Sequence, residues 1–224
     1  MNERIAAVLL LLVGGCDLPR DADHTLDRVQ RGALWVGVIR NPPWVTDSGT
    51  SIRGVDVELV ERMAADLGAR VTWSGGTESE LLTSLHGREL DLVIGGLSGN
   101  SPWKKQVAFT RPYYIDSTLV SPSHAPDLKG DSVAFRAGDP VAIYLRRKGA
   151  VPVPVADLAS VQGPVAGPAW WFAAQSRASG GRTLHTDKRV MAVAPGENGW
   201  LNWVERWLSR HQSSVPALLG AGGK

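Results

Sequence analysis

The sequence predicts an α/β fold in which helices flank sheets rich in parallel strands, because strand and helix patterns alternate along the chain. Apolar, β-rich runs at residues 33–39, 70–73 and 90–94 predict three strands. Between them, residues 55–67 and 77–85 repeat apolar side chains at helical spacing. The run at 90–94 is almost wholly apolar, which is typical of a central strand buried on both faces.

Local signals mark the ends of the elements in this first unit. Residues 25–31 predict one or two helical turns that end at Gly32. Gly68 follows the helix at 55–67, where a left-handed C-cap would lie. Thr77 and the glutamate three residues later form a capping box that predicts where the second helix begins.

A second unit begins near residue 132. Residues 132–137 predict a strand, and Asp139 is expected to cap a helix whose first residue is Pro140. Residues 151–155 predict an edge strand, because its two prolines cannot donate ladder hydrogen bonds. The rest of the chain predicts a strand end at 165–167, a helix at 169–176, a strand at 190–194, a helix from 197 to about 211, and a weakly structured tail at 216–224.

Composition excludes several classes of function. The 224 residues are 43% hydrophobic and 21% charged, which is usual for globular proteins and excludes a wholly disordered chain. The net charge is +2 without a basic stripe, so no nucleic-acid partner is expected. The five histidines do not stand at metal-ligand spacing, and no phosphate loop or dinucleotide fingerprint occurs. We therefore expect no metal and no cofactor.

The first sixteen residues have the pattern of a secretory signal. Arg4 precedes an apolar run at residues 5–13, which is shorter than the roughly 20 residues that span a bilayer. Residues 13–16 (Val-Gly-Gly-Cys) resemble the lipobox of bacterial lipoproteins, in which Cys16 becomes the lipid-modified N-terminus. The alternatives are an ordinary signal peptide with an incidental cysteine, and a buried N-terminal strand.

Lipidation of Cys16 would remove residues 1–15, leave residues 16–25 as a tether, and hold the protein at a membrane through its acyl chains. Asp17 resembles the inner-membrane retention signal of some Gram-negative lipoproteins. The expected location is therefore the periplasmic side of a bacterial membrane, or the extracellular face.

Residues 87–114 carry the most specific motif in the chain. Asp91 is followed by three apolar residues, a small residue and Gly96, then the hydroxyl residue Ser98, a short basic helix, and a Pro-Tyr-Tyr ending. This pattern resembles the family 3 periplasmic solute-binding proteins, which feed amino acids and related compounds to ABC importers. Weaker resemblances to the same family lie at residues 34–44, 53–59 and 190–198.

The resemblance implies a two-lobed, type II periplasmic-binding-protein fold that clamps a small-molecule ligand between its lobes. Lobe one would comprise residues 26–113 plus 193–220, and lobe two residues 118–188. Two crossing strands near 114–117 and 188–192 would form the hinge. The implied partner is an ABC permease in the membrane, and the protein itself is expected to be a monomer.

Within lobe one the resemblance suggests a ligand site at the end of the central strand. In the family, the positions of Gly96 and Ser98 offer a backbone carbonyl, an amide and a hydroxyl to an α-amino acid; an ordinary turn is the alternative. Trp103 stands where amino-acid receptors have an arginine that pairs with the ligand carboxylate. Asn41 and Glu78 stand near aromatic positions of the family, and Glu78 either binds a cationic group or belongs to the first turn of its helix.

Lobe two supplies three further candidates. Arg136 is either a pocket residue or part of a structural salt bridge, and Asp139 either contacts the ligand or only caps its helix. The family's ammonium-binding acid should come near residues 168–169, where none is present. Trp170, or its neighbour Trp171, either lines the cleft or packs in the core. Since both charged anchors are missing, the resemblance implies a ligand that is not an ordinary α-amino acid.

Two alternative functions remain open. The first is an enzyme with this two-lobed fold, such as a prephenate-type dehydratase, which would need Glu78 or Asp139 as general acid and Arg136 as a basic anchor. The second is a lipoprotein that senses a solute or docks a partner without transport. The leading prediction is a binding protein without catalytic residues.

Overall fold

The computed structural model describes residues 21–30, 32–49, 51–121, 128–175 and 181–222. The predicted signal segment, Cys16 and Asp17 lie outside these residues.

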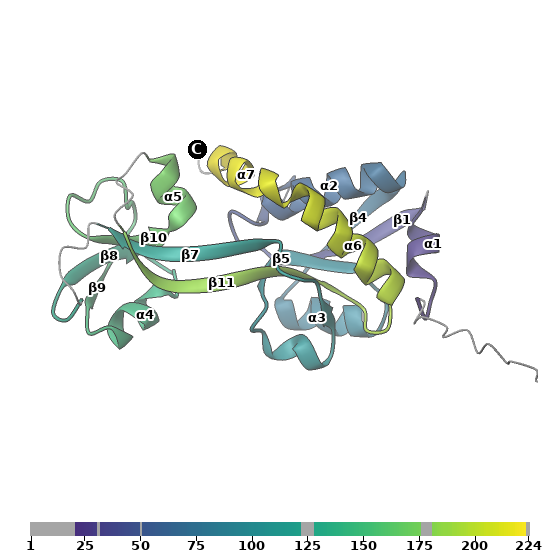
Figure 1. Ribbon diagram of the computed structural model, residues 1–224, viewed down its shortest axis with the longest axis horizontal. Helices are drawn as coiled ribbons and strands as arrows, with labels where there is room; N and C mark the ends of the chain where they lie inside the picture. The colour runs from purple at the N-terminus through teal and green to yellow at the C-terminus, as the bar shows by residue number, and fades with distance from the viewer. Residues whose placement is uncertain (1–20, 31, 50, 122–127, 176–180, 223–224) are drawn as a thin grey trace, which may run out of the picture.

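Nine strands of the described chain form one sheet that runs the length of the molecule (Figure 1). The strand order is β4-β1-β5-β11-β7-β10-β8-β9, and β6 pairs separately with β11. The strands are β1 (Ala33–Val38), β4 (Arg70–Gly75), β5 (Leu92–Ser98), β6 (Ala108–Phe109), β7 (Tyr114–Ser121), β8 (Ser132–Arg136), β9 (Val151–Val155), β10 (Val165–Pro168) and β11 (Arg182–Val193). A separate hairpin pairs β2 (Thr46–Asp47) with β3 (Ile52–Arg53).

At one end of the sheet, β4, β1 and β5 pair in parallel, as the sequence predicts. Helices α2 (Val55–Leu67), α6 (Asn198–His211) and α7 (Val215–Gly222) cover one face, and α3 (Glu78–His86) covers the other (Figure 1). Strand β5 contributes Leu92 and Ile94 to the first core and Val93 and Leu97 to the second. Its predicted burial on both faces is therefore confirmed.

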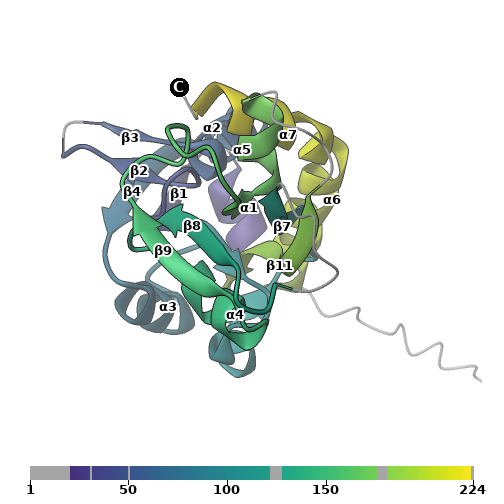
Figure 2. The same ribbon diagram turned by 90° about the vertical axis from the view of Figure 1, so that its left-hand side faces the viewer.

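At the other end, β8, β9 and β10 carry α4 (Val141–Arg147) and α5 (Ala169–Ala174) (Figure 2). Among the described strands, β9 lies at the edge of the sheet and pairs only with β8, which suits its two prolines. Small cores lie on both faces: Phe135 packs with Leu145 on the α4 side, and Val165 packs with Phe172 on the α5 side.

Strands β7 and β11 connect the two ends as an antiparallel pair, and Tyr114 lies opposite Arg189. Strand β11 pairs with β7 up to Arg189, and from Arg189 onward it also pairs with β5. The sequence predicts only the part at 190–194, because residues 182–189 are mostly polar and have no apolar strand pattern. These residues are held by backbone pairing on β7 instead of by burial.

The predicted start of the helix that follows Asp139 differs from the structure. Pro140 is the N-cap of α4, and the helix begins at Val141, one residue later than predicted. Asp139 still accepts a hydrogen bond from the Val141 amide at 2.9 Å, so its predicted capping contact is present. The Asp139 side chain reaches an amide two residues on, and either start of the helix allows this contact.

The prediction of a weakly structured tail is wrong, because residues 215–222 form α7. Val215 and Leu219 lie one helical turn apart and are both fully buried in the large core. Tertiary burial therefore stabilises a helix whose small residues and glycines give it little propensity of its own. The remaining elements are α1 (Thr25–Val29) and the 3₁₀ turns η1 (Pro102–Lys105) and η2 (Gln212–Ser214).

Candidate ligand-binding site

The predicted site in lobe one lies where β5 passes through Gly95 and Gly96. Both glycines have positive φ, 140° and 62°, and both amides point at one carboxylate oxygen. Oδ2 of Asp56 accepts from Gly95 N at 3.0 Å and from Gly96 N at 2.8 Å. Oδ1 of Asp56 accepts from the Tyr113 hydroxyl at 2.6 Å. A single buried side chain therefore holds the strand end.

Burial controls the ionisation of this pair. Asp56 is fully buried, which raises the pKa of its carboxyl above 3.8, although the hydrogen bonds from Tyr113 and the two glycines and the charge of Arg189 oppose the shift. Burial and the neighbouring Asp56 raise the pKa of Tyr113 well above 10. In the sequence, Asp56 lies in the weakly family-like stretch at residues 53–59, between two valines at a helix start, where solvent-exposed acids are also common.

Gly96 is required by the close approach of an indole ring. A Cβ at this position would lie 2.3 Å from Cδ1 of Trp44, which is too close for any side chain. Trp44 is buried, and it contacts Tyr113 edge-on and Tyr114 at a tilt, with centroid distances of 6.2 and 5.7 Å. Gly96 thus lies in close contact with this buried aromatic cluster.

Arg189 fills the space in front of the Gly96 carbonyl. Its Nη1 donates to the Gly96 carbonyl at 2.7 Å, and its Nε and Nη2 donate to Oδ2 of Asp116 at 3.1 and 2.6 Å. Nη1 also lies 3.3 Å from Oδ2 of Asp187. The guanidinium carbon lies 5.3 Å from the centroid of the Trp44 ring, within cation–π range.

The Ser98 hydroxyl is occupied from the same strand. It donates to Oδ1 of Asp187 at 2.7 Å. Strand β11 therefore binds two of the three polar groups that the sequence assigned to a ligand, the Gly96 carbonyl through Arg189 and the Ser98 hydroxyl through Asp187. The Gly96 amide is bound by Asp56. Sequence reasoning missed Arg189 and Asp187, because their partners lie about ninety residues earlier in the chain.

The other candidates of lobe one contact β5 or the residues just after it. Asn41 donates through Nδ2 to the Gly95 carbonyl at 2.9 Å, so its amide braces the strand end. Glu78, at the start of α3, accepts from the Ser101 hydroxyl at 3.1 Å. The same hydroxyl caps η1 by accepting from Trp103 N at 3.4 Å, and the half-buried Trp103 ring packs against the core beneath α3.

The candidates of lobe two are arranged differently. Arg136 is exposed at the end of β8, and Asp139 is engaged at the start of α4. Within the described residues, no hydrogen bond or ion pair joins either side chain to Gly96, Ser98 or Trp103. Trp170 is half-buried and packs against both the large core and the α5 core, so it bridges the two ends of the molecule, whereas Trp171 is buried beside Phe172.

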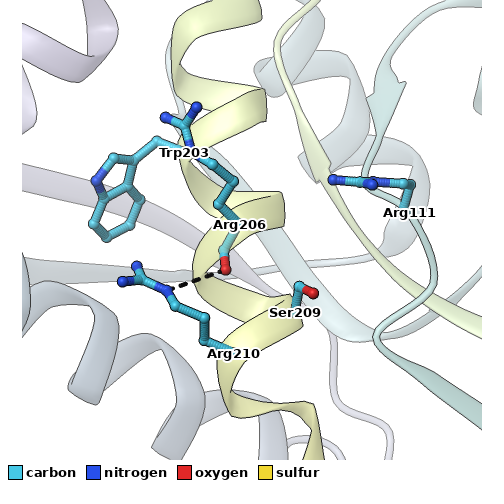
Figure 3. Close-up of a pocket in the computed structure, with 5 residues that line it drawn as sticks. All are labelled: Arg111, Trp203, Arg206, Ser209 and Arg210. Carbon is cyan, nitrogen blue, oxygen red and sulfur yellow. Dashed lines mark hydrogen bonds between the residues drawn. The ribbon is translucent and has the colours of Figure 1, made fainter.

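A hollow of about 470 Å³ lies on the outer surface of α6, away from these residues. Figure 3 shows Trp203 and Arg206 on one side of α6 and Arg111 across the hollow on a separate segment. Arg111 is held by Glu205 at 2.8 Å. With an excess of arginine and an open form, this surface would attract anions but could not enclose a solute. Its lining residues are Arg111, Trp203, Arg206, Ser209 and Arg210.

The described ranges contain neither a metal-binding cluster nor a membrane-spanning helix. No three His, Cys, Asp or Glu side chains of the described chain lie together in a group that could hold a metal ion. None of the helices in the described chain is long and apolar enough to cross a membrane.

Residues 34–215 match the family model described as bacterial extracellular solute-binding proteins, family 3. Among curated proteins, the chain is 31% identical over 103 residues to the putative ABC transporter arginine-binding protein 2 of Escherichia coli (strain K12), which is 43% of this chain and 42% of that protein. It is 28% identical over 155 residues to the L-cystine-binding protein TcyJ of the same strain, which is 64% of this chain and 58% of that protein. The chain thus covers less than two thirds of these relatives.

Solved structures agree on the fold. An ancestral cationic amino acid solute-binding protein, AncCDT-1, has a TM-score of 0.68 and 21% identity, covering 88% of this chain and 98% of that one. The unliganded, open L-cystine solute receptor of Neisseria gonorrhoeae has a TM-score of 0.62 and 16% identity, covering 85% of this chain and 91% of that one. The predicted two-lobed type II fold is confirmed.

Proposed function

Because the chain belongs to the bacterial extracellular solute-binding proteins, family 3, we propose that it clamps a small organic solute between two lobes and delivers it to an ABC importer. Lobe one would comprise residues 26–113 plus 193–220, and lobe two residues 118–188. The antiparallel pair of β7 and β11, which links the two ends of the sheet, supports a hinge near 114–117 and 188–192. Closure of the hinge would bury the solute and create the shape that the permease recognises.

The solute is not an ordinary α-amino acid. One observation carries this part of the proposal: Arg189 occupies the Gly96 carbonyl and Asp187 occupies the Ser98 hydroxyl. An amino acid would have to compete with Arg189 for the carbonyl and with Asp187 for the hydroxyl proton. Trp103 supports the same conclusion, since an indole can stack on a solute but cannot pair with a carboxylate.

We further propose that Cys16 carries the lipid anchor and that Asp17 keeps the protein at the inner membrane of a Gram-negative host. Replacement of Cys16 by Ser should release the protein from washed membranes and abolish palmitate labelling. Membrane retention of the unlabelled variant would contradict the anchor.

A thermal-shift screen of the chain without residues 1–15 tests the binding function. The library should contain amino acids, polyamines, quaternary amines, organic acids and short peptides. A ligand at about 100 times its Kd stabilises the native state by about 2.7 kcal/mol, which raises the midpoint by several degrees in a protein of this size.

We expect one chemical class other than the proteinogenic amino acids to raise the midpoint, and Trp103→Ala to weaken that shift. A shift produced by proteinogenic amino acids would refute the proposed ligand class. Calorimetric titration that detects no binding of any compound would contradict the solute-binding function itself.

A further inference from the structure

Arg189 lies at the place where β11 changes its neighbours. It pairs with Ser98 of β5 on one side and with Tyr114 of β7 on the other. Its side chain is only 18% exposed, which is unusual for an arginine on a strand that links two lobes. Such burial requires acceptors for the guanidinium, and the structure supplies them from three directions.

The groups around the guanidinium have the character of a recognition site for an organic cation. Asp116 accepts two N–H groups on one oxygen, Asp187 provides a second carboxylate, and the Gly96 carbonyl accepts a third N–H at 2.7 Å. The Trp44 ring adds an aromatic face, with its centroid 5.3 Å from the guanidinium carbon. Carboxylates, a carbonyl and an aromatic face are the groups that bind guanidinium and ammonium ions.

The charges around Arg189 also favour a cation. Asp116 and Asp187 carry two negative charges against the single positive charge of Arg189, and the buried Asp56 lies close enough to feel that charge. Asp116 is 8% exposed, and within the described chain its buried Oδ1 has no hydrogen-bond partner. An unpartnered buried carboxylate oxygen can accept a further N–H donor, whereas an anionic solute would be repelled here.

We infer that Asp116, Asp187, the Gly96 carbonyl and the Trp44 ring form a recognition site for guanidinium and ammonium groups, which the chain fills with its own Arg189. While Arg189 stays in place, solutes with such a group are excluded from these acceptors. Arg189 is thus a specificity-determining residue, and this role in selectivity rests on the proposed solute-binding function.

Removal of the Arg189 side chain should open the site to a small guanidinium ion. In the Arg189→Ala variant, 10 mM methylguanidinium chloride should raise the thermal midpoint by about 3 °C or more, as expected for a ligand well above its Kd. The unaltered protein and Arg111→Ala, which loses an exposed arginine, should not respond. Tetramethylammonium chloride, a cation without N–H donors, should shift the midpoint of Arg189→Ala far less than methylguanidinium does, because it can contact the Trp44 ring but cannot donate to the carboxylates or the carbonyl.

A second substitution connects the response to the proposed acceptors. Adding Asp116→Asn to Arg189→Ala should weaken methylguanidinium binding at least tenfold in calorimetric titration. If Arg189→Ala does not fold alone, its refolding yield should recover with methylguanidinium and not with sodium or tetramethylammonium chloride. Absence of a specific response in both the folded and the refolding assay would overturn the inference. This outcome is independent of the solute screen on the unaltered protein, which tests the proposed function.

Discussion

The Tyr113 hydroxyl donates a 2.6 Å hydrogen bond to Oδ1 of Asp56, and both side chains are removed from solvent. The other oxygen of Asp56 binds the two amides at the end of β5. Asp56 therefore couples the start of α2, the chain before β7 and the strand end that bears the candidate site. Its ionisation should influence the stability of all three segments together.

Asp56→Asn should change the pH dependence of stability. Burial raises the pKa of Asp56, so its contribution to stability is present below its unfolded pKa and is lost as pH rises through the folded pKa. Asparagine can still accept from the glycine amides and can donate to the Tyr113 oxygen. The free energy of unfolding of the variant, relative to the unaltered protein, should therefore increase with pH.

Urea unfolding between about pH 4 and pH 8 measures this difference. Tyr113→Phe is the matched control, because it removes a donor that lowers the pKa of Asp56 while leaving the carboxyl in place. It should cost about 1.5–3 kcal/mol, the range for a hydrogen bond to a charged group. Parallel pH curves for Asp56→Asn and the unaltered protein would show that Asp56 does not titrate differently on folding.

Gly96→Ala should destabilise the protein by roughly 3 kcal/mol, because overpacking and a strained backbone each cost about 1–3 kcal/mol. The new Cβ would lie 2.3 Å from the Trp44 ring, and φ at this residue is 62°. Gly75→Ala is the control, since no atom lies within 4 Å of a Cβ built there. Equal unfolding midpoints for the two variants would contradict the packing of Trp44 on Gly96.

Leu219→Ala should cost about 2–5 kcal/mol, as for other large-to-small substitutions in cores. Leu219 is fully buried, and it belongs to the helix at the end of the chain that the sequence did not predict. Ile143→Ala on α4 removes a similar side chain that is 52% exposed, so it should change stability far less. Denaturant unfolding of both variants compares them, and a cost below about 1 kcal/mol for Leu219→Ala would mean that α7 does not pack on the core.

Thr77→Ala should cost about 1 kcal/mol at neutral pH, because it removes the N-cap of α3. Thr77 binds the Glu80 amide at 3.3 Å, and the Glu80 carboxylate binds the Thr77 amide at 2.9 Å. Thr83→Ala, within the same helix, is the control and should be neutral or slightly stabilising, since alanine is the better helix former.

The effect of Thr77→Ala should also shrink in acid. Hydrogen bonds from Thr77 lower the pKa of Glu80, so the stability they confer is present above its unfolded pKa and is lost as pH falls through the folded pKa. Thermal unfolding at about pH 3 and pH 7 makes the comparison. A constant difference between variant and unaltered protein would mean that the two halves of the capping box act independently.

Sequence reasoning succeeded where local patterns decide the structure. The apolar run that became β5 and the capping box of α3 are both confirmed, since each depends on residues close together in the chain. It failed for α7 and for the first half of β11. The burial of Leu219 and the pairing of residues 182–189 depend on partners that are distant in sequence, so no local pattern encodes them.

The candidate site shows the same division. Gly96 and Ser98 could be singled out because they belong to a compact motif that follows a buried strand. Arg189 and Asp187 could not be singled out, since they lie in a polar run. Their contacts with Gly96 and Ser98 form only when β11 pairs with β5. Asp56 is intermediate: its position between valines hints at burial, but its three donors come from residues 39 to 57 positions later.

The pairing of Tyr114 with Arg189 determines which segment of the chain could be exchanged as a unit. The chain leaves one half of the molecule and returns to it at two points on adjacent strands, which are about 5 Å apart. The residues between these points form one continuous segment, and the pairing of β7 with β11 holds the two ends of that segment in register. The far half could therefore be exchanged for that of a relative as one cassette, with two junctions, while the half that holds α1 and α7 stays unchanged.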